Sequence, residues 1–232
     1  MRIELDKSSR KFIKLNRVYP AEVPNLAKQC LIEFKSVMDE LNLKWCIFGG
    51  TLLGAYRDND FIYNDDDIDC ALIIEDTANL TYSDLKELGA TIIEKFDKLG
   101  WLRMSFDRNG MNNGFSFYRF NIQFDIDIIK KVDEDKVYEF WYVNRPSRNE
   151  LRGRPNDYPK RINGKYFNNL EEISFLDIKV SIPSYVEEIF EDYYTDWKNV
   201  HLINKEKMMW KRTTTIDDHT DWDYKNNGRT YN

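Results

Sequence analysis

The stretch Phe48-Gly49-Gly50-Thr51-Leu52-Leu53-Gly54-Ala55-Tyr56-Arg57, followed after one short loop by Asp65-Asp66-Asp67-Ile68-Asp69, carries the strongest signal in this 232-residue chain. Its paired glycines leave the backbone free to approach an anion closely. Its four carboxylates stand where an apolar segment begins, and such close like charges raise one another's pKa unless a cation lies between them. A divalent cation with a phosphate bound beside it meets both conditions. The stretch therefore predicts metal-dependent chemistry on a phosphorylated substrate.

The segments around this stretch predict two strands and a short helix that hold it in place. Residues 44–48 and 68–74 are apolar and predict buried strands, while 52–57 predicts a short helix between them. The free N–H groups at the start of such a helix would lie beside the carboxylates. We therefore expect the backbone at Gly49-Gly50-Thr51 to contact a phosphate oxygen.

Carboxylates recur at a spacing of two residues on two predicted strands. Side chains two residues apart in a strand project to the same face, so Asp67 and Asp69 can share metal ions. The predicted strand 122–129 repeats this spacing with Asp125 and Asp127. An acidic run alone could be a solvated loop or a calcium-binding turn, but the EF-hand spacing of glycine and closing glutamate is absent. The combination with the glycine turn favours a metal site.

Further helices and strands are predicted outside the acidic strands. Apolar residues at three- and four-residue steps predict helices over 25–43 and 81–99. Additional strands are predicted over 101–106, 115–120 and 137–143 and within 172–182. Ser184, with Glu187 three residues later, predicts a capping-box start for a last helix. We expect one domain over 1–232, with its core over about 25–200 and a poorly ordered polar tail at 212–232.

The composition excludes several classes of protein. The net charge is −6, and an acidic chain is a poor general binder of nucleic acid, because that affinity depends on Lys and Arg. Cys30, Cys46 and Cys70 lie far apart in apolar runs, which indicates buried thiols of a reducing compartment rather than disulfides. The two histidines offer no zinc-ligand spacing. No segment reaches the roughly twenty apolar residues of a membrane helix, so we expect a cytoplasmic protein without a membrane span.

The glycine stretch, the pair Phe61-Ile62 and the acidic run together closely resemble the signature of the LicD family. This family comprises the phosphocholine transferases of bacterial surface glycans and is related to fukutin and the fukutin-related protein. The resemblance is strong over 48–70 and looser over the rest of 25–200. Two positions depart from the family's pattern. Asn64 stands where a Trp or Tyr precedes the acidic triplet, and Thr195 stands where a Gly is expected near the C-terminal Asp-Trp pair.

The resemblance implies an α+β fold, in which a nucleotidyltransferase-like mixed β-sheet is flanked by helices and followed by added C-terminal strands and a helix. It also implies Mg²⁺, or alternatively Mn²⁺, held by Asp67, Asp69 and a third carboxylate at Asp125. Asp127 lies on the same predicted strand face, so it competes with Asp125 for the third position, and one of the two could instead act as general base toward an acceptor hydroxyl. The rest of the acidic run would support these catalytic residues.

The reaction implied by the resemblance transfers a phosphorylated alcohol, such as phosphocholine or an alditol phosphate. The donor would be CDP-linked, the acceptor a hydroxyl of a glycan or glycolipid, and the by-product CMP. Arg57 follows the short helix and either contacts a donor phosphate or forms an ion pair with Asp58 or Asp60. Lys179 is a second candidate for phosphate contact.

Two other functions would use the same carboxylates. A true nucleotidyltransferase would attack the α-phosphorus of a nucleoside triphosphate and release pyrophosphate. A non-enzymatic metal- or glycan-binding module would bind its ligand without turnover. Product analysis separates the three, because CMP, pyrophosphate and no product are their respective signatures.

Overall fold

The computed structural model describes residues 17–75, 82–106, 114–131, 136–139, 160–194 and 196–199. The strands of its main sheet are β1 (Lys44–Ile47), β2 (Asp67–Ile74), β3 (Leu102–Phe106), β4 (Phe115–Arg119), β5 (Ile122–Lys131), β6 (Lys136–Glu139) and β7 (Lys160–Asn163). A separate hairpin consists of β8 (Glu171–Phe175) and β9 (Ile178–Ile182). The helices are η1 (Pro20–Glu22), α2 (Pro24–Glu40), α3 (Gly49–Arg57), α4 (Tyr82–Lys98), α5 (Lys165–Asn168) and α6 (Val186–Tyr193).

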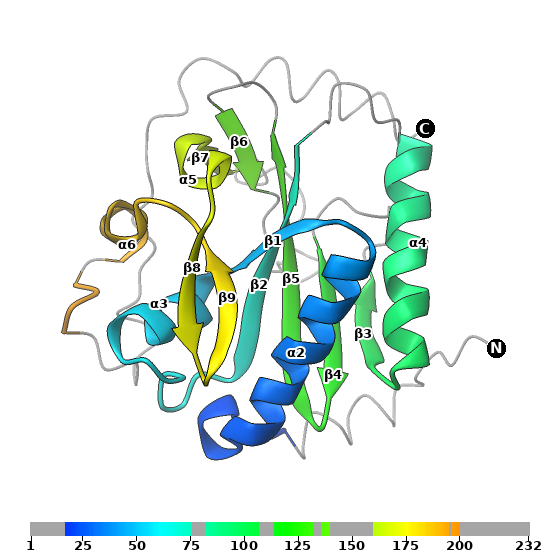
Figure 1. Ribbon diagram of the computed structural model, residues 1–232, viewed down its shortest axis with the longest axis horizontal. Helices are drawn as coiled ribbons and strands as arrows, with labels where there is room; N and C mark the ends of the chain where they lie inside the picture. The colour runs from blue at the N-terminus through cyan, green and yellow to red at the C-terminus, as the bar shows by residue number, and fades with distance from the viewer. Residues whose placement is uncertain are drawn as a thin grey trace, which may run out of the picture.

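The main sheet is mixed, and its order is β1-β2-β5-β4-β3, with β6 pairing β5 and β7 pairing β6 (Figure 1). β2 and β5 are parallel neighbours, whereas the other pairs in the sheet are antiparallel. The β8–β9 hairpin contacts β1. The predicted α+β class, a mixed sheet flanked by helices with added C-terminal strands and a helix, is confirmed.

Aromatic side chains fill the layer between the sheet and the helices α2 and α4. Phe34 of α2 packs on Phe124 of β5 with 5.0 Å between ring centroids. Phe96 of α4 lies 5.0 Å from Phe117 of β4 and 4.7 Å from Trp101. Such pairs contribute roughly 0.5–1.5 kcal/mol each beyond the burial of their area. This face of the sheet is therefore the apolar core, which leaves the opposite face for polar chemistry.

An ion pair fastens α2 to the edge of this core. Arg119 of β4 donates two hydrogen bonds of 3.0 Å to the two carboxylate oxygens of Glu33, and Trp101 Nε1 donates a third of 2.6 Å. Burial alone would raise the pKa of Glu33, but the hydrogen bonds from Arg119 and Trp101 lower it below its usual value. In β4, Arg119 lies two residues after Phe117 and so projects to the same, core face of the sheet, whereas Ser116 and Tyr118 project to the opposite face. The clamp therefore lies on the core side of the sheet.

The parallel pairing of β2 with β5 decides which polar residues meet. Asp69 stands opposite Asp125, Asp67 opposite Gln123, and Ala71 opposite Asp127. Partner residues of neighbouring strands share a face of the sheet. The acidic positions of both strands therefore project together, away from the buried residues that alternate with them.

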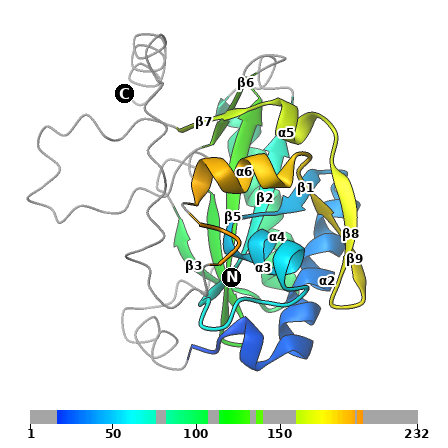
Figure 2. The same cartoon turned by 90° about the vertical axis from the view of Figure 1, so that its left-hand side faces the viewer.

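The C-terminal elements cover α3. Trp197 is buried and packs against Phe190 of α6 at 5.1 Å between ring centroids, and Tyr56 of α3 lies 5.8 Å from the same Phe190. Figure 2 faces α6 and shows it beside α3, with α2 to the right. These contacts hold the helix that follows the glycine pair in a fixed position.

The structure corrects two local predictions. α3 begins at Gly49, not after the glycines, because Leu52 N–H already donates to the Phe48 carbonyl at 3.0 Å. The capping box at Ser184 is wrong: the residue that caps α6 is Tyr185, with a φ of 56°, and it makes no side-chain capping bond. The Ser184 hydroxyl instead donates to the Asn169 carbonyl.

Some predictions concern residues outside the described part. Thr195 and the predicted tail at 212–232 belong to this group. Among the residues that the structure does describe, none of the helices combines the length and apolar character needed to cross a membrane.

Candidate active site

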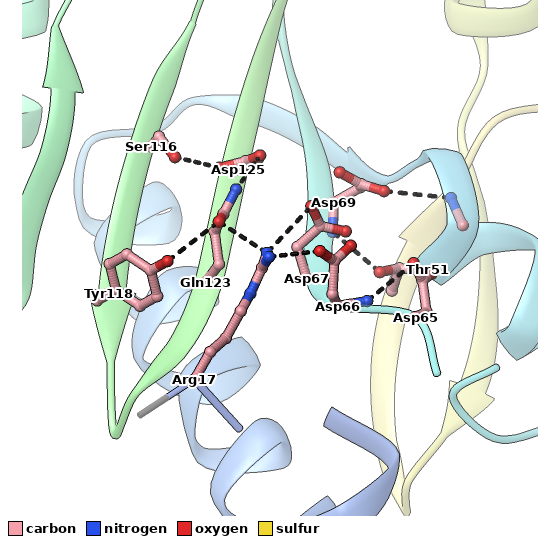
Figure 3. Close-up of polar contacts among 11 residues, drawn as sticks. Arg17, Thr51, Asp65, Asp66, Asp67, Asp69, Ser116, Tyr118, Gln123 and Asp125 are labelled. Carbon is pink, nitrogen blue, oxygen red and sulfur yellow. Dashed lines mark hydrogen bonds and ion pairs between the residues drawn. The ribbon is translucent and has the colours of Figure 1, made fainter. Parts of the chain in front are cut away.

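Three carboxylates converge where β2 and β5 begin their parallel pairing (Figure 3). Asp67 and Asp69 of β2 and Asp125 of β5 each offer an oxygen atom, and these atoms lie within 4.8 Å of one another. The register explains this arrangement, because Asp69 stands directly opposite Asp125. Asp127 follows on the same face of β5, opposite Ala71, and its charge raises the pKa of Asp69 further. The structure thus places together the three residues predicted as metal ligands.

The glycine turn docks directly on Asp69. Gly50 N–H donates to Asp69 Oδ2 at 3.2 Å, and the Thr51 hydroxyl accepts a 2.9 Å bond from Asp69 N–H. Gly49 has a φ of +55°, and a Cβ atom there would lie 2.6 Å from Asp69 Oδ2. At Gly50 a Cβ atom would lie 2.2 Å from Asp65 Oδ2. The positive φ makes Gly49 the position that requires glycine, whereas a Cβ at Gly50 would displace the Asp65 carboxylate. The anion beside the turn in this structure is Asp69 itself.

Burial and mutual repulsion raise the pKa of all three carboxylates. Burial, followed by the charges of Asp125 and the neighbouring acidic run, raises the pKa of Asp67 to about 8. Burial and Asp67 raise the pKa of Asp69 well above its usual value. Burial also raises the pKa of Asp125, although hydrogen bonds from Ser116 and Gln123 oppose the shift. Without a cation these shifts favour the protonated carboxyls, and a bound cation would favour the charged forms.

Hydrogen bonds fix the orientation of Asp125. The Ser116 hydroxyl, on the neighbouring strand β4, donates to Asp125 Oδ1. The Gln123 amide donates to Asp125 Oδ2 at 2.8 Å. Each carboxylate oxygen thus has one donor and keeps capacity for a further ligand.

Arg17 is a residue of this site that the sequence did not reveal. Its guanidinium donates to Asp66 and, at 2.7 Å, to Gln123 Oε1, and it lies 3.7 Å from Asp67 Oδ2. Figure 3 shows it between the two acidic strands. It precedes η1 and belongs to no motif, so no local pattern in the sequence marks it. Its position depends on contacts between distant segments.

Arg57 and Lys179 are the other predicted substrate contacts. Arg57 donates to both carboxylate oxygens of Asp58, at 2.8 and 2.6 Å, and to the Trp197 carbonyl at 2.9 Å. Of the two alternatives for Arg57, the structure therefore shows the ion pair with Asp58. Lys179 is exposed on β9. A phosphate contact by either residue stays a prediction.

The donor set fits a hard divalent cation. Carboxylate oxygens are the ligands that Mg²⁺ and Mn²⁺ prefer, and a soft metal would require thiolate or imidazole. Asp65, Asp66 and Asp67 form a second overlapping group within the same distance limit. The raised pKa values give a further reason for the fit, because a cation among these oxygens relieves the repulsion that raises them.

Comparison with known proteins gives only distant structural similarities. No curated protein matches the chain significantly. The lincosamide antibiotic adenylyltransferase LnuA, bound to lincomycin, superimposes with a TM-score of 0.44 at 12% identity, over 69% of this chain and 82% of LnuA. The antibiotic-resistance factor ANT(2'')-Ia gives a TM-score of 0.42 at 16% identity, over 77% of this chain and 76% of the factor. These similarities are too low to add to a family assignment.

A family model gives the assignment. The model described as LicD/FKTN/FKRP, nucleotidyltransferase domain, matches residues 42–185, which include the glycine turn and all the clustered carboxylates. This match extends over more than half of the chain and agrees with the signature at 48–70. The chain therefore belongs to the LicD/FKTN/FKRP nucleotidyltransferase-domain family.

Proposed function

We propose that this protein is a divalent-metal-dependent phosphotransferase that moves a phosphorylated alcohol from a CDP-linked donor to a hydroxyl of a glycan or glycolipid. The observation that carries the proposal is the convergence of Asp67, Asp69 and Asp125 beside the glycine turn. Family membership supports a transferase of phosphorus-containing groups and a nucleotide-linked donor. The alcohol would be of the phosphocholine or alditol phosphate type.

The three clustered carboxylates would hold Mg²⁺ or Mn²⁺. When bound, the cation supplies charge neutralisation for the donor pyrophosphate and for the departing CMP. The chain's own contribution is to keep the three side chains oriented and partly shielded from water, so that their charges act at full strength. Ser116 and Gln123 perform this orientation for Asp125, and Gly50 for Asp69.

Asp127 is the candidate for the proton transfer. It lies on the same face of β5 as Asp125 but outside the group of three that share the 4.8 Å limit. In the proposed reaction it takes the proton of the acceptor hydroxyl, whose oxygen then forms a bond to the phosphorus distal to the nucleoside. The bond from that phosphorus to the bridging oxygen breaks, and CMP leaves with the electron pair.

Product analysis tests the proposal. The protein is incubated with Mg²⁺, a set of CDP-linked alcohols and a glycan acceptor, and the release of CMP is followed by chromatography. We expect CMP from the wild-type protein and a loss of at least about a hundredfold in Asp67→Asn, because a ligand of the activating cation is removed. Asp177→Asn is the matched control, since that side chain is 99% exposed.

The same assay separates the alternatives. Pyrophosphate released from a nucleoside triphosphate, with no CMP from any CDP-linked donor, would identify a true nucleotidyltransferase. Metal or glycan binding without either product would identify a non-enzymatic module. Full CMP release by Asp67→Asn would exclude the proposed site.

A further inference from the structure

Gln123 connects Arg17 to Asp125 through two hydrogen bonds (Figure 3). Arg17 donates to Gln123 Oε1 at 2.7 Å, and Gln123 Nε2 donates to Asp125 Oδ2 at 2.8 Å. The Tyr118 hydroxyl is a second, longer donor to the same Oε1, at 3.3 Å. A guanidinium has donors only, so it requires the amide oxygen to face Arg17 and the amide NH₂ to face Asp125. We call this chain of contacts the Arg17–Gln123–Asp125 relay.

The relay prepares Asp125 to bind a cation. With Ser116 on one oxygen and Gln123 on the other, both carboxylate oxygens accept a hydrogen bond. These two donors fix the plane of the carboxylate and so determine where its remaining lone pairs can meet a metal. If the Gln123 amide were turned round, its carbonyl oxygen would face Asp125 and repel it. The guanidinium prevents this, because its own donors would then meet the amide NH₂.

Arg17 also reaches the other acidic strand. It contacts Asp66, and it lies 3.7 Å from Asp67 Oδ2. The backbone beside it is anchored to the β4–β5 turn, because Val18 N–H donates to the Asn121 carbonyl at 3.0 Å. One side chain from the N-terminal segment thus contacts Asp66 and Asp67 directly and reaches Asp125 through Gln123. It does so from outside residues 42–185, which the family model matches.

We propose that Arg17 is a positioning residue of the metal site, which acts through Gln123 to hold Asp125 in the orientation that binds the cation. The inference rests on the proposed metal-dependent function but concerns the affinity of the site for the ion, not turnover. An alternative role for Arg17, as a bare positive charge beside the cluster, predicts the opposite effect. Removing such a charge would strengthen cation binding by Coulomb's law, whereas breaking the relay weakens it.

Mn²⁺ binding to the full chain without any donor tests the inference, measured by isothermal titration calorimetry. Arg17→Met and Gln123→Met are each expected to weaken Mn²⁺ binding by about tenfold, the lower end of the effects of residues that orient metal ligands. The double variant should lose no more than either single variant, because both changes act on the same carboxylate. Lys28→Met is the control for charge, because Lys28 is a cation of α2 that pairs with the exposed Asp177 and is not part of the relay.

Two results would overturn the inference. One is Mn²⁺ binding by Arg17→Met that is unchanged or tighter, and the other is a double variant whose loss equals the product of the single losses. The thermal unfolding midpoint of each variant shows whether the fold is retained. If Arg17→Met does not fold, unchanged Mn²⁺ binding by Gln123→Met contradicts the inference by itself. A wild-type protein that binds Mn²⁺ through the relay but releases no CMP would refute the proposed reaction alone.

Discussion

Asp67, Asp69 and Asp125 are costly to hold together, and the rest of the site limits that cost. Each is largely buried beside like charges, so burial and repulsion favour the protonated forms. Hydrogen bonds from Gly50 and Gln123 partly oppose this by stabilising the charged forms. A bound divalent cation would relieve this repulsion, so the cluster is best explained as a metal site.

The raised pKa of Asp67 makes a prediction about stability. Its pKa is about 8 in the folded protein, against an ordinary value of 3.8 for an aspartate, so the folded state binds the extra proton between about pH 4 and pH 8. Without a divalent cation, the free energy of unfolding should therefore fall as the pH rises through this window. Asp67→Asn should be more stable than the wild type at pH 8, and the difference should shrink at pH 5.

Urea denaturation in the presence of a chelator, at pH 5 and pH 8, measures this effect. Asp69 and Asp125 shift in the same direction, so the variant should retain part of the pH dependence. A variant whose stability follows that of the wild type at both pH values would show that Asp67 carries no excess proton.

The sequence predicted the carboxylates of this site but not the residues that orient them. Asp67 and Asp69 were found because a two-residue spacing in a strand is a local pattern. Arg17 and Gln123 have no such pattern, since they are 106 residues apart in the chain and meet only through the register of β5. Long-range contacts of this kind leave no periodic signal in a single sequence.

At the scale of elements, one face of the sheet packs against the helices α2 and α4, and the opposite face carries the clustered carboxylates. Phe34 and Phe124 pack on the α2 side, and Asp125 lies on the other. The amphipathic helices were predicted closely, because 25–43 and 81–99 correspond to α2 and α4. The ends of shorter helices were not. α6 starts at Val186 and its N-cap is Tyr185, which has a positive φ, while Ser184 bonds to Asn169 and does not cap the helix.

The clamp between α2 and β4 should stabilise the fold without affecting the site. Glu33→Gln leaves Arg119 without its counter-charge and weakens the hydrogen bonds to Arg119 and Trp101. We expect a loss of about 1–3 kcal/mol in the free energy of unfolding, measured by urea denaturation. Mn²⁺ affinity should not change, because the clamp lies on the core face.

Glu94→Gln is the matched control for the clamp. Glu94 pairs with Lys98 on the exposed side of α4, where solvent screens the charges, so stability should be unchanged. Equal effects of the two substitutions would show that the Glu33 contacts contribute no more than a surface pair. A loss of Mn²⁺ binding in Glu33→Gln would show that the two faces of the sheet are coupled.

At the scale of the whole molecule, three distant parts of the chain assemble one site. The N-terminal segment contributes Arg17, and β5 contributes Asp125. The α3–β2 region contributes the glycine turn and the pair Asp67 and Asp69. Family membership explains the second and third parts, since both lie within residues 42–185. The α+β class was predictable because the family signature is strong, whereas the strand order that places Asp69 opposite Asp125 was not.

The most direct test of the account is calorimetric titration with Mn²⁺ of the wild type, Asp125→Asn and Asp127→Asn. The two substituted positions lie two residues apart on the same face of β5, so each variant is a control for the other. The account predicts that Asp125→Asn weakens Mn²⁺ binding by at least about tenfold, while Asp127→Asn binds nearly as the wild type does. Unchanged binding by Asp125→Asn, or an equal loss in both variants, would contradict the assignment of Asp67, Asp69 and Asp125 as the metal site.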